Sequence, residues 1–399
     1  MKLTPAMQQY YDIKEQYKDA ILFFRMWDFY EMFAEDANIA HRVLGIAVTS
    51  RNKNAAEPIP LAGIPYHAKE KYLPMLVKAG YKVAIAEQVS DPKLKGIVKR
   101  EVVRVVTPST LDLEWEWYAD IKASNYIVSV VFEKDIYAVS FLDITTNSWL
   151  CSEFTNFEQV SSEIYKISPS EVILSKSLFE DEQIKEVFSK KYSLNIYFFE
   201  LQWKPHEILC QHFWVKNLEW FWIEKKKMAQ KAAAQVIEYL KLNQKSDLSF
   251  LDSLSYESFS EFLDLDETTI RSLDLIYNMS TKSSKLWTLF GVLDDTKTSM
   301  WGRYLRDQIL YPLQDIKEIE RRQDFVEEFY KNPVLLDRIQ KKLRWVADID
   351  AILNRLALWR AGVRDLTHLK KSLVAISEVI ELIWAEWNKK LSTIVSRID

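Results

Sequence analysis

Glycine is scarce in this sequence, and tryptophan is unusually common. The 399 residues include 7 glycines, whereas an average usage of about 7% would supply roughly 28. Tryptophan, which is normally rare, occurs 14 times. Because glycine supplies the positive φ angles of tight turns and helix ends, a chain of this length with so few glycines should have difficulty making its corners.

Cysteine and long apolar runs are also nearly missing. The two cysteines, Cys151 and Cys210, exclude a disulfide framework and suit a reducing compartment. Residues 1–19 contain no apolar stretch, which excludes a secretory signal peptide. No uncharged apolar run approaches about 18 residues, the minimum for a membrane-spanning helix. We therefore expect no membrane segment.

The sequence lacks the motifs of common catalytic sites. A Walker A loop is absent, even if every tryptophan is read as glycine, and no G-x-S-x-G motif occurs. His206, Cys210 and His212 resemble a metal cluster, but their spacing does not put three ligands on one helical face. Asp135 and Asp143 suggest a two-metal nuclease, which would need several further converging carboxylates. We therefore assign no catalytic residue and no metal ligand.

The net charge of −4 excludes a wholesale polycation, but the charge is unevenly distributed. Residues 1–110 carry 16 Lys and Arg against 12 Asp and Glu, a net of +4, and the rest carry 37 against 45, a net of −8. A mildly basic N-terminal part is compatible with a surface that faces phosphates, and equally with random fluctuation. Charge alone therefore does not decide the function.

Hydrophobic periodicity divides the chain into three domains. Residues 1–112 have a mixed α/β pattern, with strands in DAILFFRM, GIAVTSR, KVAIAEQV and REVVRVVTP and a helix in KEKYLPMLVKAGY. Residues 121–245 begin with a three-stranded antiparallel meander and alternate helix and strand before a helix at about 226–242. Residues 250–399 are nearly all helical, and the last helix, from about 364, runs to Asp399 without a cap. The expected fold class is two α/β domains followed by an all-α domain, cut inside a longer protein.

The stretch FFRMWDFYEMF, residues 23–33, joins an apolar run to an expected helix over residues 29–44, with Trp27 at a corner that normally wants a small residue. One interpretation is structural: Asp28 and Glu31 form a capping box, and Phe29 or Tyr30 extends the apolar stripe of the helix into the core. The other is an exposed aromatic at a helix tip with a carboxylate two residues on. Such an aromatic can wedge into a base step, and the carboxyl can accept a hydrogen bond from a base edge.

Several long motifs resemble the N-terminal mismatch-binding domain of the bacterial MutS family, the sensors of DNA mismatch repair. They are TPAMQQYYDIK, ILFFRMWDFYEMF, EPIPLAGIPYHA, VAIAEQVSDP and VKREVVRVVTPST. The family's Phe-x-Glu motif falls on Phe29 and Glu31. The resemblance therefore implies that Phe29 stacks on a mispaired or unpaired base from the minor groove and that Glu31 hydrogen-bonds this base. Pro60, Leu61 and Ala62 match a family loop near the same groove, and the implied partner is double-stranded DNA with mismatches or small loops.

The resemblance continues through FLDITTN, LDLDETTIRSLDL, LFGVLDDTKTSMWGRYLRDQILYPL and RLALWRAGVRDL. It implies an RNase H-like connector domain without nuclease carboxylates, followed by core and lever helices. The family's DNA clamp, ATPase and main dimer interface would lie beyond this chain. We therefore expect no enzyme activity and no cofactor here, with ATP and Mg²⁺ bound by the missing ATPase. The family also implies a homodimer, a MutL-type partner and a cytoplasmic, nucleoid-associated protein.

Two other functions remain open at this point. The chain could be a MutS-like structural or interaction module, or a recombination factor without mismatch reading, in which Phe29 is merely a core residue. Solvent exposure of Phe29 separates these functions from mismatch recognition. A nuclease would be revealed by metal-dependent cleavage of plain duplex DNA.

Tryptophan stands at several positions where the family usually has glycine. These positions are Trp27, Trp214, Trp220, Trp222, Trp287, Trp301, Trp345 and Trp359. Independent drift would scatter to many residue types and not to one. We hypothesise that the source organism reads UGA as glycine and that these codons were translated as tryptophan, which explains the low glycine and the high tryptophan together. Trp149 and Trp203 can be genuine under this hypothesis, and the alternative is a real chain adapted to bulky corners.

Overall fold

The computed structural model describes residues 4–50, 58–89, 98–110, 125–244, 248–278, 286–359 and 361–385. The chain forms two compact units, the first made of Met1–Tyr118 with Val236–Asp247 and the second of Ala119–Gln235 with Leu248–Asp399. Each unit contains one six-stranded sheet. Within the described ranges, no helix has the length and apolar character needed to cross a membrane.

The sheet of the first unit has the strand order β3-β4-β2-β1-β5-β6. Its strands are β1 (Ala20–Met26), β2 (Phe29–Phe33), β3 (Thr49–Ser50), β4 (Pro60–Pro65), β5 (Lys82–Gln88) and β6 (Arg100–Val106). The strand expected in GIAVTSR is confined to β3 in the described residues. β1 runs parallel to β5, and the other neighbours are antiparallel. The two-residue turn Trp27-Asp28 joins β1 to β2, and β2 has ladder partners on both sides.

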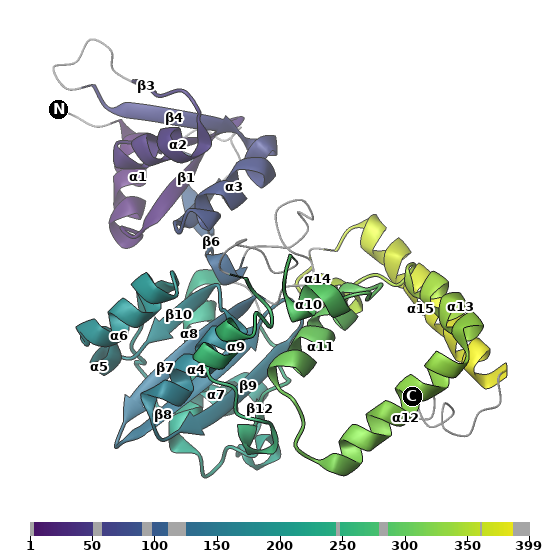
Figure 1. Ribbon diagram of the computed structural model, residues 1–399. Coiled ribbons are helices and arrows are strands. Elements are labelled where there is room, and N and C mark those ends of the chain that lie inside the picture. Colours follow the sequence, from purple (N-terminus) through teal and green to yellow (C-terminus); the bar gives the residue numbers. More distant parts are fainter. Residues whose placement is uncertain are drawn as a thin grey trace. The chain divides into compact units, whose positions relative to one another are not determined.

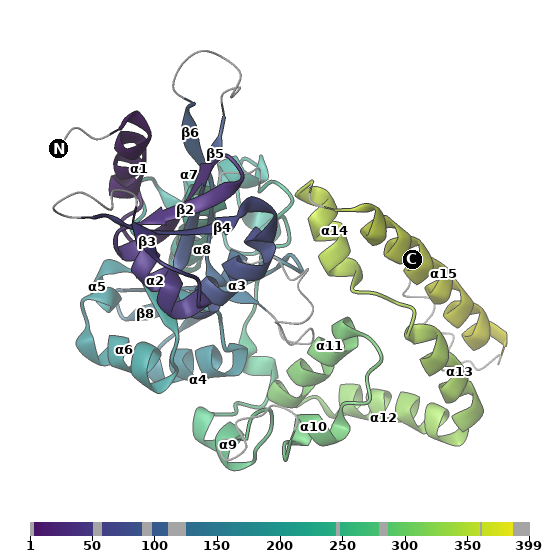
Figure 2. The ribbon, with the colours of Figure 1, turned by 90° about the horizontal axis from the view of Figure 1, so that it is seen from above.

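Helices pack on both faces of this sheet (Figure 1, Figure 2). They are α1 (Pro5–Gln16), α2 (Glu35–Leu44) and α3 (Lys69–Lys78), and a short 3₁₀ helix, η1 (Tyr66–Ala68), leads into α3. Met7 and Tyr10 of α1 pack in a cluster with Phe24 and Phe33. α2 and α3 bury their apolar stripes in a second cluster that contains Tyr30. Because strand side chains alternate, β2 supplies core residues to both clusters.

The expectation of a helix over residues 29–44 is wrong for its beginning. Residues 29–33 form β2, and α2 begins only at Glu35. Asp28 is therefore a turn residue and no N-cap, and no capping box joins it to Glu31. The apolar residues from Phe29 to Phe33 fit the period of a strand as well as that of a helix. Pairing with β1 and β4 decides between the two.

The second unit begins with a mixed sheet of order β11-β10-β7-β8-β9-β12. β7 (Tyr126–Glu133), β8 (Ile136–Asp143) and β9 (Ser148–Phe154) form the predicted meander, while β10 (Glu171–Leu174), β11 (Asn195–Phe198) and β12 (Ser255–Tyr256) pair in parallel. Its helices are α4 (Phe157–Ile167), α5 (Lys176–Phe179), α6 (Glu182–Glu186), α7 (Pro205–Phe213) and the beginning of α8 (Lys227–Gln244), whose residues from Val236 onward belong to the first unit. The α/β fold class predicted for the connector is confirmed.

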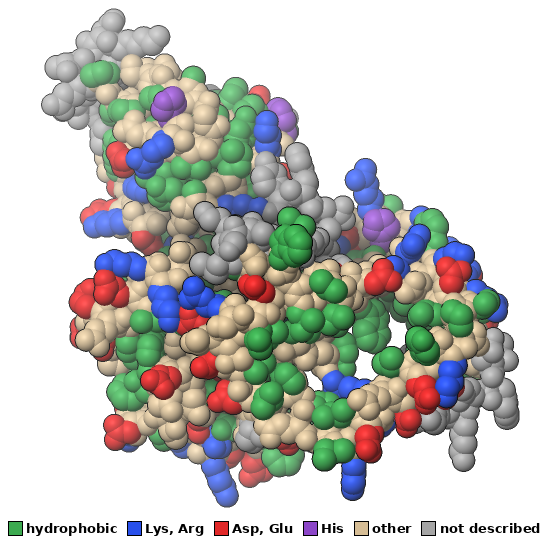
Figure 3. Space-filling model, viewed as in Figure 1, with side chains coloured by type: hydrophobic (Ala, Val, Ile, Leu, Met, Phe, Trp, Pro, Cys, Tyr) green, Lys and Arg blue, Asp and Glu red, His purple; other side chains and the backbone are tan. Residues whose placement is uncertain are grey.

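After β12 the second unit is helical, as predicted. The helices are α9 (Glu267–Ser272), α10 (Leu289–Leu293), α11 (Ser299–Leu310), α12 (Ile316–Lys331), α13 (Pro333–Leu343), α14 (Ile349–Ala357) and α15 (Val363–Ala385). Hydrophobic side chains reach the surface over this part (Figure 3). Val292, Val326 and Tyr330 are among the exposed hydrophobic residues of these helices. The expected run of the last helix to the end of the chain falls outside the described residues.

Polar side chains buried between α4 and α11 join the mixed sheet to the helical part. Lys166 Nζ lies 2.5 Å from Glu163 Oε1, and the Tyr311 hydroxyl donates to Glu163 Oε2 at 2.9 Å. Arg306 of α11 donates to the Lys166 carbonyl at 2.9 Å. Burial raises the pKa of the neighbouring Asp307 to about 6, against the opposing effect of Arg306. Hydrogen bonds and ion pairs therefore link α4 to α11, although a pocket of about 390 Å³ borders Glu163, Lys166 and Tyr311.

Tryptophan occurs in two different settings. Trp149 on β9 is 0% exposed, and its indole Nε1 donates to Ser140 Oγ at 2.9 Å. Five others have φ angles from 54° to 62° and are 68% to 96% exposed: Trp27, Trp214, Trp222, Trp287 and Trp359. A bulky residue at positive φ is an outlier, because glycine adopts this region without steric cost. Trp220, Trp301 and Trp345 do not have positive φ angles.

Candidate nucleic-acid interface

The candidate interface lies at the end of the first sheet, where the β1–β2 turn meets the end of β4. Phe29 is directly opposite Met26 of β1 and Pro65 of β4. Its side chain is 47% exposed, whereas that of the next residue, Tyr30, is buried. Phe29, the residue that the sequence singled out, is therefore exposed at this end, as are Trp27 at 68% and Tyr66 at 44%, and it lies on a strand and not at a helix tip.

Phe29 is exposed because the cover over its face of the sheet stops short. Phe33, four residues further along β2 and on the same face, is buried, with its ring centroid 4.8 Å from that of Tyr10 in α1. The cluster around α1 contains Phe24 and Phe33 but does not extend to Phe29. Because about half of the ring stays in water, the protein loses about 1 kcal/mol of the stabilisation that full burial of a phenylalanine would give. This uncovered ring makes the end of β2 a candidate for contact with a ligand.

Glu31 shares the face of Phe29, and Gly63 of β4 lies opposite Glu31. A Cβ atom on residue 63 would lie 4.0 Å from both Glu31 Cγ and Phe29 Cδ1. The absence of a side chain at Gly63 thus keeps a space open beside the ring and the carboxylate. Residues two apart on a strand are separated by about 6.6 Å, so one flat ligand can contact the ring and also reach the carboxylate.

Pro60, Leu61 and Ala62 are in a strand and not in the loop that the sequence led us to expect. They belong to β4, where Leu61 and Ala62 pair with Phe33 and Met32, the far end of β2 from Phe29. Ala62 is buried in the core with α2 and α3, and Leu61 packs against the cluster around α1. The structure therefore brings Phe29 and Glu31 together and places these three residues further along the sheet.

Sequence reasoning missed the residues that flank Phe29. Gly63 and Pro65 lie opposite Glu31 and Phe29, and the Tyr66 N–H donates to the Asp28 carbonyl at 2.8 Å. The motif EPIPLAGIPYHA contains all of them, but their position beside Phe29 depends on the β2–β4 register. No local pattern in the sequence specifies this register.

Charged and aromatic side chains pack behind the turn, on the face of Tyr30. The Arg25 guanidinium carbon lies 3.9 Å from the ring centroid of Tyr66 and 5.5 Å from that of Tyr30. Arg25 Nη1 is 4.0 Å from Glu87 Oε2, and the Tyr30 hydroxyl donates to Glu87 Oε1. Burial and this hydrogen bond raise the pKa of Tyr30 above its ordinary value. Arg25 Nε also donates to the Trp27 carbonyl at 2.5 Å, which ties the cluster to the turn.

The other sequence candidates do not converge on a site. Asp135 lies in the β7–β8 turn, and Asp143 lies at the opposite end of β8, where it is buried. His206 approaches Cys210 within 3.7 Å, but His212 is directed to the Leu251 carbonyl at 2.8 Å. In the part of the chain that the structure describes, no group of three or more His, Cys, Asp and Glu side chains could hold a metal ion.

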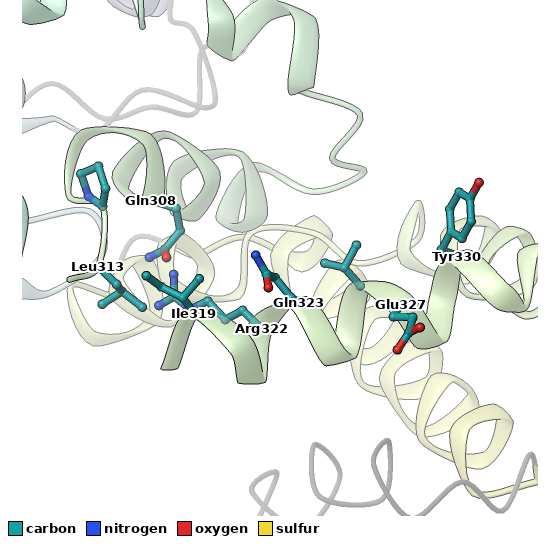
Figure 4. A pocket seen from close by; sticks show the side chains of 9 residues that line it. Gln308, Leu313, Ile319, Arg322, Gln323, Glu327 and Tyr330 are labelled. Atoms are coloured by element: carbon teal, nitrogen blue, oxygen red, sulfur yellow. The ribbon is translucent and has the colours of Figure 1, made fainter. Parts of the chain in front are cut away.

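A groove of about 540 Å³ lies beside α12, with Leu313 and Ile319 toward one end of its lining and Tyr330 toward the other (Figure 4). Its lining is mostly apolar and contains Gln308, Pro312, Leu313, Ile319, Arg322, Gln323, Val326, Glu327 and Tyr330. No histidine, cysteine or serine is among these residues, so the groove contains no Ser-His or Cys-His pair. It does not compete with the end of β2 as a candidate site.

Family models of MutS domains I, II and III match residues 4–114, 125–252 and 268–398 of this chain. The candidate interface lies within the range matched by domain I. The matches follow one another along the chain in the order of the domain numbers. The two α/β regions and the helical region thus each correspond to one matched domain.

Curated proteins named DNA mismatch repair protein MutS are similar to nearly the whole chain. That of Methanococcoides burtonii is 39% identical over 390 residues, which is 96% of this chain and 44% of the relative. Those of Halothermothrix orenii and Caldanaerobacter subterraneus are 40% and 37% identical over 95% and 100% of this chain, and it covers 42% and 46% of them. The chain therefore spans less than half the length of these relatives.

Proposed function

Because the chain belongs to the MutS family and carries its domains I, II and III, we propose that it recognises mismatched double-stranded DNA in mismatch repair, through the exposed end of β2. The observation that carries this proposal is the 47% exposure of Phe29 beside Glu31, inside the range matched by domain I. The alternatives in which Phe29 is a core residue are disfavoured by the same exposure.

Phe29 acts as the wedge in this proposal. An apolar ring inserted between base pairs from the minor groove unstacks a step and kinks the duplex, at a cost of a few kcal/mol. A mispaired or unpaired base is already poorly stacked, so the same kink costs less there than at a matched pair. Selection then comes from the deformability of the duplex and not from its sequence.

Glu31 holds the displaced base. A carboxylate near DNA is repelled by the phosphates unless it accepts a hydrogen bond from a base edge or is protonated. The space beside Gly63 gives the base edge a place next to Glu31 Cγ. Pro60, Leu61 and Ala62 belong to the same interface in this proposal, and because Ala62 is buried they contribute by supporting β2 or through backbone contact.

The proposal for the whole protein follows the relatives, which are more than twice as long as this chain. It has domain boundaries at 1–112, 121–245 and 250–399, a homodimer, a MutL-type partner and a cytoplasmic, nucleoid-associated location. An ATPase that uses ATP and Mg²⁺ lies beyond residue 399, and this chain itself is no enzyme. The complete reading frame tests this part, because a Walker A loop downstream is its necessary consequence.

The test of the wedge is Phe29→Ala in the complete gene product, with binding measured on matched duplex, a G·T mismatch and a one-base insertion. We expect the preference for the two imperfect duplexes to disappear, while affinity for matched duplex changes little. Phe198→Ala is the control, because Phe198 is 43% exposed in the other sheet. A Phe29→Ala protein that keeps its mismatch preference would show that the wedge is elsewhere.

We also propose that the natural protein has glycine at the tryptophan positions named above, through reading of UGA as glycine. Positive φ angles at Trp27, Trp214, Trp222, Trp287 and Trp359 support this, because glycine alone adopts them readily. Trp214 and Trp222 also end helical segments in the left-handed conformation, where helices commonly have glycine. Mass spectrometry of the protein from its source organism tests the proposal, and tryptophan at position 27 would overturn it.

A further inference from the structure

We propose that the back of the same tip, formed by Tyr66 and Arg25, is a second DNA contact that holds the sugar–phosphate backbone without reading the bases. This inference rests on the proposed function, since it assumes that Phe29 enters the minor groove. It adds a positioning surface, whereas Phe29 and Glu31 supply selection.

Tyr66 is fixed to the turn that presents Phe29. It follows Pro65, the ladder partner of Phe29, and its N–H donates to the Asp28 carbonyl at 2.8 Å. Its side chain is 44% exposed, close to the value for Phe29. A ligand that receives the Phe29 ring and extends around the turn to the other face of the sheet therefore comes close to Tyr66.

Arg25 orients the Tyr66 ring. Its guanidinium carbon lies over both the Tyr66 and the Tyr30 ring, at 3.9 and 5.5 Å from their centroids. The guanidinium is held in turn by the Trp27 carbonyl and by Glu87, 4.0 Å away. A ring fixed in this way loses little conformational entropy when it binds a ligand. The Trp27 contact uses its backbone, so it is the same whether residue 27 is tryptophan or glycine.

The hydroxyl of Tyr66 is available for a phosphate. In the described part of the chain, no residue forms a hydrogen bond with it, whereas the hydroxyl of Tyr30 is engaged by Glu87. The minor groove is bounded by two walls, and a tip that inserts Phe29 into the groove lies against at least one wall. That wall consists of deoxyribose and phosphate, which accept hydrogen bonds from a phenol and attract a guanidinium.

The experiment compares Tyr66→Phe with Phe29→Ala in the complete gene product, on the same matched, G·T and one-base-insertion duplexes. Tyr66→Phe keeps the ring on Arg25 and removes only the hydroxyl. We expect about tenfold weaker binding to all three duplexes, because a hydrogen bond to a charged group is lost, with the ratio between them unchanged. Tyr304→Phe is the control, because Tyr304 is 46% exposed on α11, and it should bind all duplexes normally.

A second variant tests the orienting role of Arg25. Arg25→Lys keeps the charge but loses the planar stack on Tyr66, and we expect it to weaken binding to all three duplexes as Tyr66→Phe does. The inference is overturned if Tyr66→Phe binds all three like the unsubstituted protein, or if it loses affinity for imperfect duplexes only. A uniform loss in Tyr66→Phe with the preference retained in Phe29→Ala would support the backbone contact and overturn the wedge, so the two proposals fail separately.

Discussion

An aromatic side chain on one strand of the first sheet is exposed, whereas one on a strand of the second sheet is fully buried. In the first unit, β2 carries Phe29 past the helices that cover the sheet and leaves it 47% exposed. In the second, β9 carries Trp149 into an interior where the rings of His212 and Phe213 lie 5.8 and 5.6 Å away. The difference lies in the helical cover and not in the strands, since both aromatics have ladder partners on a neighbouring strand.

The comparison separates two uses of a ring. Trp149 has its polar atom satisfied by Ser140, so its burial contributes to stability without an orphaned donor. Phe29 has no polar side-chain atom, and its half-exposed ring contributes less to the core than a buried ring would. A large aromatic that folding leaves uncovered, beside a carboxylate and a side-chain-free glycine, is better explained by a ligand than by packing.

The largest expected effect is on stability at Trp149. Trp149→Ala should destabilise the second unit by about 3–5 kcal/mol, because it leaves a cavity in a closed core. Phe29→Ala should cost less than about 1 kcal/mol, because the ring is half exposed. Hydrogen exchange read by mass spectrometry, which reports each unit separately, measures both. Equal losses in the two units would contradict the distinction between a packed and an uncovered aromatic.

The next largest expected effect is on stability at Asp307, in the joint between α4 and α11, and this effect depends on pH. The pKa of Asp307 is about 6 in the folded protein and about 3.9 in an unfolded chain. In the folded state Asp307 therefore stays protonated to a higher pH than in the unfolded chain. The stability falls as pH rises from about 4 to 6, and it stays lower above about pH 6. Asp307→Asn should recover at most about 3 kcal/mol at pH 8 and almost nothing at pH 4.

Thermal unfolding of Asp307→Asn at the two pH values measures this effect. Asp135→Asn is the control, because Asp135 lies in an exposed turn and asparagine tolerates its positive φ angle of 60°. The difference in unfolding temperature between Asp135→Asn and the unsubstituted protein should be the same at both pH values. If Asp307→Asn stabilises the protein equally at both pH values, the effect is not the desolvation of a carboxyl group.

The smallest expected effect concerns the tip itself. In protein made with the printed sequence, Trp27→Gly should stabilise the first unit by about 1 kcal/mol, because it relieves a left-handed conformation. Trp203→Gly is a matched control, because Trp203 is equally exposed at 68% but has no positive φ angle. It should not stabilise the protein. Replacing Trp27 should thus raise the stability, whereas replacing Trp149 should lower it. Calorimetry of Trp27→Gly and Trp203→Gly measures the effect at the tip.

The sequence predicts most of this fold where periodicity is unambiguous. The alternating residues of β7, β8 and β9 and the stripe of α2 from Ala37 to Leu44 are examples. The prediction failed at Phe29 to Phe33, because apolar residues there fit both periods and tertiary pairing decides between them. A motif predicts Phe29 and Glu31 as site residues, whereas the positions of Gly63 and Tyr66 beside them depend on pairing between strands about 30 residues apart, which no local pattern encodes.

That β2 lies between two partner strands has a mechanical consequence. In the proposed function, a bent duplex pushes back on the wedge that holds it open, and this force would enter the protein through the Phe29 ring. The backbone of Phe29 is flanked by Met26 on one side and Pro65 on the other, so a push along β2 loads its ladders in shear, across several hydrogen bonds at once. A helix tip would take the same load at its frayed first turn. The strand makes the wedge stiff, and a stiff wedge leaves the deformation to the DNA.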